Sequence, residues 1–239
     1  MTTPTRFPFA ERFKAPQGEG LYAGTMMAFA RTVGCSVGQT ICTACDTDFD
    51  RMRPDLGGGL YTPKEIAEWA GDCAHVCLTG GEPLDRDIRP ILFDVAPRLV
   101  HIETSGTKKP WWLDPLWHEG SIRPAGVHAI GIEEEHRRTV WSELPLWVCV
   151  SPKPGYLEEM VVDIADEVKV IIGGLGEGPG WPSIEDALRW ASIGKLVYVQ
   201  PRNHRTTIDR TALDEALNVV AHHPQLRLSP QLHKFIGTR

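Results

Sequence analysis

Seven short apolar segments alternate with amphipathic segments along this chain of 239 residues, and this alternation constrains the fold most strongly. The expected strands cover residues 25–34, 75–80, 99–104, 146–151, 167–172, 195–200 and 226–230. They are rich in β-branched residues and nearly continuously apolar, which is typical of parallel strands covered on both faces. Because strands alternate with helices, we predict an α/β fold with mostly parallel strands. Seven strands favour a partial, incomplete TIM-like barrel over a complete eightfold one.

Helices are expected between most of these strands, and two of them carry clear start signals. Thr62, Pro63 and Glu65 form a capping-box pattern with proline at the first helical position. Ser183 stands at an expected N-cap, and Asp186 follows three residues later. Further helices are expected over 86–98, 154–166 and 209–223.

The stretch from 105 to 145 lacks clean periodicity and holds four of the eight tryptophans. We therefore predict a single domain over 1–239 with an insert at about 108–145. A crossover of that length is either an elaboration with a task, such as a lid or a contact surface, or a packed subdomain.

Composition and charge narrow the class of protein. The net charge of −6 argues against a nucleic-acid-binding surface, which is usually basic. The first twenty residues contain no apolar signal-peptide core, and no apolar run approaches the length of a membrane span. We therefore expect a cytoplasmic protein without a membrane or nucleic-acid partner. In the cytosol thiols stay reduced, so the six cysteines are candidate metal ligands or core residues before they are candidate disulfides.

The motifs that are unusually rich in polar residues, glycine or cysteine all follow predicted strands. They are the cysteine segment 35–45, "TGGEP" (79–83), "ETSGT" (103–107), "SPKPG" (151–155), "GG" (173–174), "QPRN" (200–203) and "QLHK" (231–234). In barrel-like α/β folds the carboxyl ends of the strands form the active-site face. The sequence therefore predicts an active site assembled from these motifs.

Three cysteines, Cys35, Cys42 and Cys45, have the spacing C-x6-C-x2-C. A structural zinc site needs four ligands, and residues 36–72 contain no histidine and no further cysteine. Iron–sulfur clusters are normally held by four thiolates, so three would leave one iron open. A zinc site completed by a distant residue remains the alternative. Cys77 and Cys149 lie in apolar strands and are interpreted as core residues.

The cysteine triad after the first predicted strand and "GGEP" after the second together resemble the radical S-adenosylmethionine (SAM) superfamily. The resemblance implies a [4Fe-4S] cluster held by Cys35, Cys42 and Cys45, with SAM on the open iron. It implies that SAM contacts Gly80, Gly81, Glu82, Ser105, Ser151 and Lys153. The usual spacing in the superfamily is x3 between the first two cysteines, so the x6 loop here is a departure.

"QGEG" (17–20), "FAR" (29–31), "CDT" (45–47), "ETSGT", "SPK" and "QLHK" narrow the resemblance to the 7-carboxy-7-deazaguanine synthase family. It covers nearly the whole chain outside 108–145. It implies ring contraction of 6-carboxy-5,6,7,8-tetrahydropterin to 7-carboxy-7-deazaguanine with loss of ammonia, on the route to queuosine and other 7-deazaguanines. It also implies a magnesium ion (Mg2+), a homodimer and an electron donor such as flavodoxin or ferredoxin.

The same resemblance implies the remaining site residues. Thr47 is the magnesium ligand, and the pterin substrate contacts Gln17, Glu19, Arg31, Thr104, Gln200, His233 and Arg239. The chemistry is carried by a radical, so no side chain is assigned as catalytic. A carboxylate such as Glu19 can accept two N–H groups from a pyrimidine edge, and a buried arginine such as Arg31 needs an anion.

Purely structural roles remain open for several of these residues. Glu19 could be an ordinary acidic residue of a loop, and Arg31 could form an internal ion pair. His233 could be a surface or core histidine whose hydrogen bonds are made within the protein. Lys169 is interpreted as a structural lysine of the barrel. For the whole chain, the alternatives are another radical-SAM activity, such as a glycyl-radical activase, and a non-catalytic protein with structural zinc.

Overall fold

The computed structural model describes residues 5–43, 45, 47–113, 145–173, 178–204 and 206–237. Within these residues, nine strands form one sheet in the order β3-β1-β2-β4-β5-β6-β7-β8-β9. Their bounds are β1 Phe7–Pro16, β2 Met26–Thr32, β3 Gly59–Tyr61, β4 His75–Gly80, β5 Leu99–Thr104, β6 Leu146–Val150, β7 Glu167–Ile172, β8 Leu196–Pro201 and β9 Arg227–Leu228. Neighbours from β2 to β9 are parallel, whereas β1 is antiparallel to both β2 and β3.

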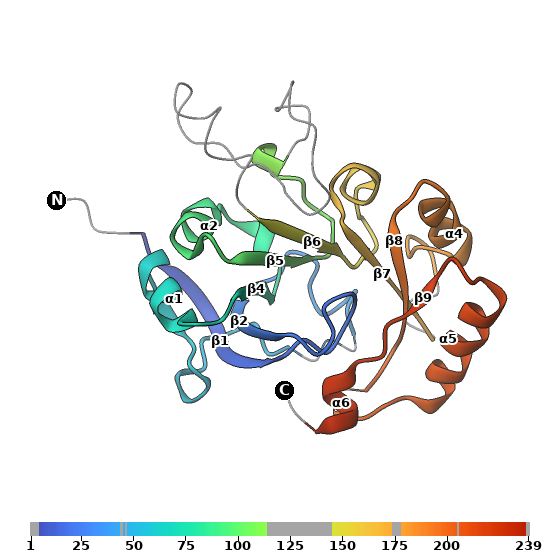
Figure 1. Ribbon diagram of the computed structural model, residues 1–239, viewed down its shortest axis with the longest axis horizontal. Coiled ribbons are helices and arrows are strands. Elements are labelled where there is room, and N and C mark those ends of the chain that lie inside the picture. The colour runs from blue at the N-terminus through green and yellow to red at the C-terminus, as the bar shows by residue number, and fades with distance from the viewer. Residues whose placement is uncertain are drawn as a thin grey trace.

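The sheet is curved and open, with the helices along its outer side (Figure 1). Among the described residues, β3 and β9 are its two edges, so the sheet does not close. The expected partial barrel with mostly parallel strands is confirmed. All seven predicted strands are present, but β1 and β3 were not predicted. β1 reads "FPFAERFKAP", whose charged residues interrupt the apolar run that marks the buried parallel strands.

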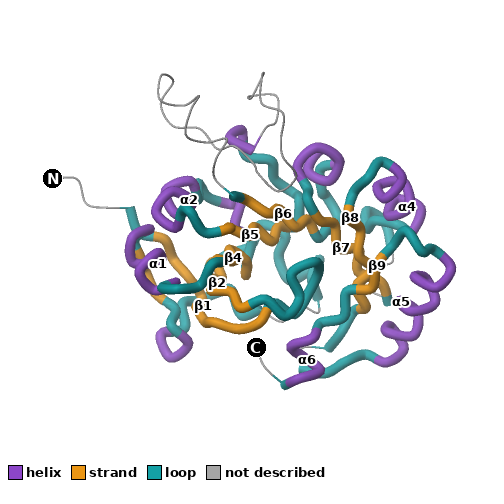
Figure 2. The backbone as a smooth tube through the Cα atoms, viewed as in Figure 1, coloured by secondary structure: helices purple, strands orange, loops and turns teal. Residues whose placement is uncertain are grey.

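Helices α1, α2, α4 and α5 cover the outer face of the sheet, whereas α6 lies beside the loop at Gly18 (Figure 2). Their bounds are α1 Pro63–Ala70, α2 Arg89–Val95, α4 Ile184–Ser192, α5 Arg210–His222 and α6 Leu232–Ile236, with 3₁₀ segments η1 Pro54–Leu56, η2 Pro83–Asp85 and η3 Trp111–Leu113. Both predicted capping boxes form at Thr62 and Ser183. The helix expected over 154–166 is much shorter than predicted, because its regular part is the π-helical segment η6, Met160–Ile164.

Two clusters of apolar side chains occupy the two faces of the sheet. The larger cluster lies between sheet and helices and includes Leu78, Ile102 and Trp190, all fully buried. The smaller one contains Ala15, Met27, Phe29 and Cys77, with Phe13 and Tyr22 packed against it. Successive strand residues point to opposite faces. Every second residue of each strand therefore lies on the inner face, and several of these residues are polar.

The segment 17–25 joins β1 to β2 and carries Tyr22 beneath the inner face. The Tyr22 ring lies 4.7 Å from the ring of His101, 5.1 Å from Trp147 and 5.4 Å from His75. His75 begins β4 and Trp147 lies near the start of β6. The segment therefore closes the inner space at the amino ends of these strands. The predicted insert is described only over 108–113 and at 145, so the single-domain interpretation stays a prediction.

Candidate active site

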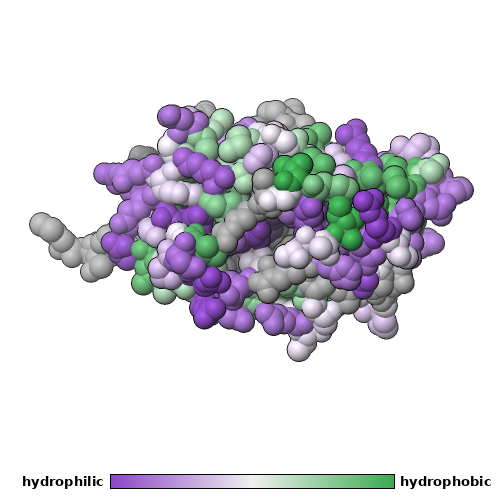
Figure 3. All heavy atoms as spheres, turned by 90° about the horizontal axis from the view of Figure 1, so that it is seen from below, coloured by the Kyte–Doolittle hydropathy of each residue, from purple (hydrophilic) through white to green (hydrophobic). Residues whose placement is uncertain are grey.

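A cavity of about 280 Å³ opens at the carboxyl ends of the parallel strands. It is lined by residues of the motifs predicted at the ends of β2, β4, β5, β6 and β8, and by residues of "QGEG" and "QLHK". One side of the cavity is rich in carboxylate and amide groups, and the other carries the three cysteines. The molecular face in Figure 3 is hollowed near its centre, with hydrophilic residues around the hollow.

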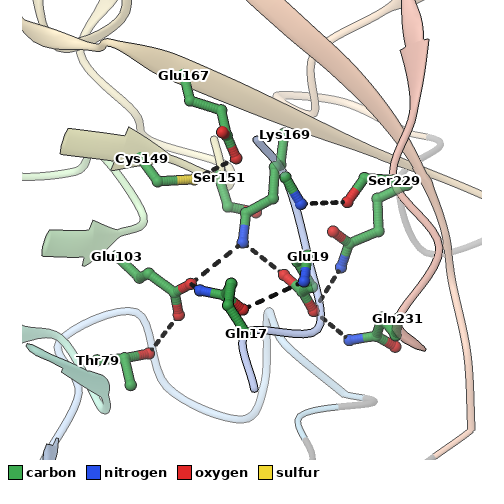
Figure 4. Close-up of polar contacts among 12 residues, drawn as sticks. Gln17, Glu19, Thr79, Glu103, Cys149, Ser151, Glu167, Lys169, Ser229 and Gln231 are labelled. Carbon is green, nitrogen blue, oxygen red and sulfur yellow. Dashed lines mark hydrogen bonds and ion pairs between the residues drawn. The ribbon is translucent and has the colours of Figure 1, made fainter. Parts of the chain in front are cut away.

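Glu19 lies at the centre of the carboxylate side (Figure 4). Its Oε2 accepts a hydrogen bond from Lys169 Nζ at 2.5 Å. Its Oε1 accepts from Gln231 Nε2 at 2.6 Å and from Gln200 Nε2 at 3.2 Å. Burial acts to raise the pKa of Glu19, but the charge and hydrogen bond of Lys169, with the Gln231 bond, outweigh it and lower the pKa to about 2. Glu19 is therefore an anion at neutral pH, with only 14% of its side chain exposed.

Lys169 joins Glu19 to a second carboxylate, Glu103 on β5. The Lys169 Nζ lies 3.6 Å from Glu103 Oε1. Glu103 is held in turn by Gln17 Nε2 at 3.1 Å and by Thr79 Oγ1 at 2.8 Å. Burial acts to lower the pKa of Lys169, but the surrounding acidic groups raise it well above its usual value. The ammonium group therefore lies charged between two carboxylates.

The glycines of "QGEG" allow this loop to pass close to other segments. A side chain at Gly18 would place its Cβ 2.2 Å from His233 Nδ1. Gly20 has a positive φ of 67°, and a Cβ there would lie 1.9 Å from Glu167 Oε1. The Gly20 N–H donates to Ser229 Oγ at 3.0 Å, and the Leu21 N–H donates to Glu167 Oε2 at 2.9 Å. These contacts fix the backbone on the carboxyl side of Glu19.

The "GGE" turn after β4 lies against the start of the cysteine loop. The Gly81 N–H donates to Thr32 O at 3.1 Å, and the Glu82 N–H donates to Gly34 O at 3.0 Å. A Cβ at Gly81 would lie 1.7 Å from Gly34 O, so only glycine fits. Because Gly34 precedes Cys35, this pairing joins the Glu82 turn to the cysteine loop.

Glu82 is buried, with 1% of its surface exposed. Its Oε1 accepts from Thr104 Oγ1 at 2.7 Å and from the Leu84 N–H at 3.1 Å. Its Oε2 accepts from the Ser105 N–H at 2.9 Å and from the Ser105 hydroxyl. None of these four donors carries a charge. The carboxylate therefore keeps its negative charge available to a cation in the cavity.

The three cysteines are thiols, and all of them line the cavity. Burial raises the pKa of Cys42, the charge of Lys153 lowers it, and Cys45 and Cys35 raise it further. Across the described ranges, no three His, Cys, Asp or Glu side chains are close enough to hold one metal ion. An iron–sulfur cluster takes one thiolate per iron, so three thiols that line one cavity could hold three irons of a four-iron cluster.

Lys153 lies on the cysteine side of the cavity, just after β6. Its Nζ donates to Ser151 O and to Ser151 Oγ, both at 2.7 Å. Burial lowers its pKa, and the Cys42 thiol opposes that shift. Both acceptors are neutral in charge, so the ammonium group is suited to an anionic ligand.

Arg31, on β2, makes the internal ion pair that was considered from the sequence. Its Nε lies 2.9 Å from Glu11 Oε1, on the antiparallel partner strand β1. Its Nη1 donates to Thr47 Oγ1 at 2.7 Å, and Thr47 is itself buried. Arg31 and Thr47 both line the cavity, so the ion pair does not remove the guanidinium group from the site.

Other residues implied by the family resemblance also line the cavity, and they lie in two groups. Gly80, Ser105 and Thr104 lie with Glu82, whereas Gln200 and His233 lie with Glu19. Arg239 lies outside the described residues. The roles of all these residues stay predictions.

Three residues of the Glu19 network were not assigned from the sequence: Lys169, Glu103 and Gln231. Lys169 lies between Val168 and Val170 in β7, and Glu103 follows Ile102 in β5. A charge at an inward position of a buried strand is the signal that could have identified them. Gln231 belongs to "QLHK", the motif that also carries His233.

An open, parallel α/β sheet with a three-cysteine loop and a glycine–glutamate turn at its carboxyl ends is the arrangement expected of a radical SAM protein. Comparison with known proteins narrows this class. The chain is 28% identical to a 7-carboxy-7-deazaguanine synthase of Bradyrhizobium diazoefficiens, over 96% of this chain and 97% of that protein. It is 29% identical to the synthase of Synechocystis, over 98% of this chain and 94% of that protein.

The fold agrees with these sequence matches. The crystal structure of QueE from Escherichia coli superposes with a TM-score of 0.62 at 23% identity, covering 95% of both chains. No family model matches the chain. The chain is thus similar to the 7-carboxy-7-deazaguanine synthases along almost its whole length, and the resemblance inferred from its motifs is confirmed.

Proposed function

We propose that the protein is a radical SAM enzyme that contracts the ring of 6-carboxy-5,6,7,8-tetrahydropterin to 7-carboxy-7-deazaguanine, with loss of ammonia, in 7-deazaguanine (queuosine-type) biosynthesis. One observation carries the proposal. A partly buried, ionised carboxylate, Glu19, lines the same cavity as the three-cysteine loop, in a chain similar to these synthases along almost its whole length.

The carboxylate side of the cavity suits a pterin. Glu19 can accept N–H groups from the pyrimidine edge. Gln200 Oε1 is buried and has no hydrogen-bond partner among the described residues, so it can accept a further donor from the ligand. Arg31 lines the cavity with its guanidinium group, which is suited to bidentate contact with the substrate carboxylate.

The cysteine side suits the two cofactors. Cys35, Cys42 and Cys45 would hold a [4Fe-4S] cluster, which together with SAM would supply radical chemistry in this cavity. Glu82 offers a buried negative charge to the amino group of SAM, and Lys153 offers a positive charge to its carboxylate.

The finer parts of the proposal rest on the family resemblance. They are Mg2+ at Thr47, a flavodoxin or ferredoxin as electron donor, a homodimer, and a cytoplasmic location. A hydroxyl oxygen is a suitable magnesium ligand, with water and substrate oxygens completing the shell. Over the part of the chain that the structure describes, no helix has the length and apolar character to cross a membrane.

The test is an anaerobic reconstitution with iron and sulfide, followed by SAM, dithionite, Mg2+ and the tetrahydropterin. Mass spectrometry should detect 7-carboxy-7-deazaguanine, and Cys42→Ala should abolish it. Cleavage of SAM with an unchanged pterin would leave another radical-SAM activity. A colourless protein carrying one zinc ion would favour the structural-zinc alternative.

A further inference from the structure

We propose that Lys169 is a positioning residue of this site. Its ammonium group, held between Glu19 and Glu103, keeps Glu19 an anion and aims it at the pyrimidine edge of the pterin. This inference rests on the proposed function.

The position of Lys169 in the fold supports this role. It lies in the middle of β7 on the inner face, lines the cavity, and is 5% exposed. A lysine that only filled the barrel could send its ammonium group toward solvent along its flexible stem. Here the ammonium group ends 2.5 Å from Glu19 Oε2 and 3.6 Å from Glu103 Oε1 (Figure 4).

Glu103 fixes the ammonium group from the opposite side. Thr79 Oγ1 and Gln17 Nε2 each donate to Glu103, from β4 and from the loop that precedes Glu19. Gln17 Oε1 also accepts the Glu19 N–H at 3.2 Å. Gln17 thus joins the Glu103 carboxylate to the backbone of Glu19, and the ammonium group lies between two acceptors whose own positions are set.

Removing the Lys169 charge would change the protonation of Glu19. Without the cation between them, the two partly buried carboxylates disfavour each other's ionised form, and burial adds to this effect. The pKa of Glu19 is then higher than in the wild type. A protonated Glu19 presents an O–H where the pterin edge also presents donors, so it loses an acceptor that the ligand needs.

Other titratable groups surround Glu19 and belong to any pH response. They are Glu103 on β5, Cys149 on β6, Lys153 after β6, Glu167 and Lys169 on β7, and His233 on α6. All except Lys169 remain in a Lys169 variant. A difference between that variant and the wild type therefore isolates the effect of the Lys169 charge.

The experiment measures binding of 6-carboxypterin, a fluorescent oxidised analogue that keeps the pyrimidine edge and the carboxylate. Titrations on the purified protein need neither dithionite nor turnover. The dissociation constants of Lys169→Met, Lys169→Gln and Lys169→Arg are divided by the wild-type value at each pH, which cancels titration of the ligand. The matched control is Lys195→Met, since Lys195 lies just before β8 and its Nζ donates to the carbonyl of Ala165, which lies just before β7.

We expect the ratio for Lys169→Met and Lys169→Gln to rise as pH falls, by about tenfold per pH unit below the new Glu19 pKa. Lys169→Arg should restore a flat ratio. Adding Glu103→Gln to Lys169→Met should flatten it in part, because one of the two carboxylates is gone. The Lys195→Met ratio should stay near one at every pH.

Several results would overturn the inference. A wild-type protein that does not bind the pterin would overturn the proposed function and this inference together. Wild-type binding with a Lys169→Met ratio that is flat across pH would overturn the inference alone. Failure of both neutral variants to fold, even with Glu103→Gln, would make Lys169 a residue of the fold and also overturn it.

Discussion

His101 should make the folded protein sensitive to mild acid. It lies on the inner face of β5, is 2% exposed, and its Nε2 lies 2.9 Å from His75 Nδ1. Burial, and then the charge that His75 would carry, lowers the pKa of His101 from 6.5 to about 3. The folded protein therefore keeps His101 neutral at pH values where an unfolded chain would protonate it.

The sign and size of the effect follow from proton linkage. Above about pH 6.5 the folded and unfolded states bind the same number of protons at this residue, so it contributes no pH dependence. As pH falls from about 6.5 toward 3, the unfolded state binds more protons and the free energy of unfolding decreases. At about pH 5 an unfolded histidine is roughly thirtyfold more protonated than neutral, which corresponds to about 2 kcal/mol.

The measurement is urea unfolding of the wild type and His101→Gln between about pH 7 and pH 5. Glutamine cannot titrate, yet it can still exchange a hydrogen bond with His75. We expect the wild type to lose about 2 kcal/mol more than the variant over this range. The control is His204→Gln, because the His204 side chain is 65% exposed and should follow the wild type. A difference between wild type and His101→Gln that does not change with pH would refute the reasoning.

Three further predictions concern the fold around the site. Gly81→Ala places a methyl group 1.7 Å from Gly34 O, so we expect loss of iron incorporation and a lower urea midpoint; normal iron content would contradict this. Ser183→Ala removes the N-cap acceptor of α4 and should cost about 1 kcal/mol, whereas Ser192→Ala, at the other end of the helix, serves as the comparison. Trp190→Ala should cost about 3–5 kcal/mol by emptying a fully buried site, and a loss below about 1 kcal/mol would exclude the packing described here.

The fold was predictable wherever the pattern was local. The seven parallel strands are mostly apolar runs, and Thr62 and Ser183 cap helices through residues three positions away. β1 was missed because its charged residues interrupt the apolar run, and β3 because it is short and pairs with a strand distant in sequence. The Phe7-to-Tyr61 register, for example, joins residues that no local pattern relates.

The sequence by itself determined which chemical groups the site holds. The three-cysteine motif, "GGE" and "QGEG" are short sequence motifs. The alternation of strands and helices predicted that they lie at one end of the sheet. Only the tertiary structure decided how those groups are paired. Arg31 meets Glu11 across antiparallel strands, and Lys169 meets Glu19 across 150 positions of chain. Such contacts depend on sheet curvature and on which strand face is inward, and these properties emerge only when the whole sheet is assembled.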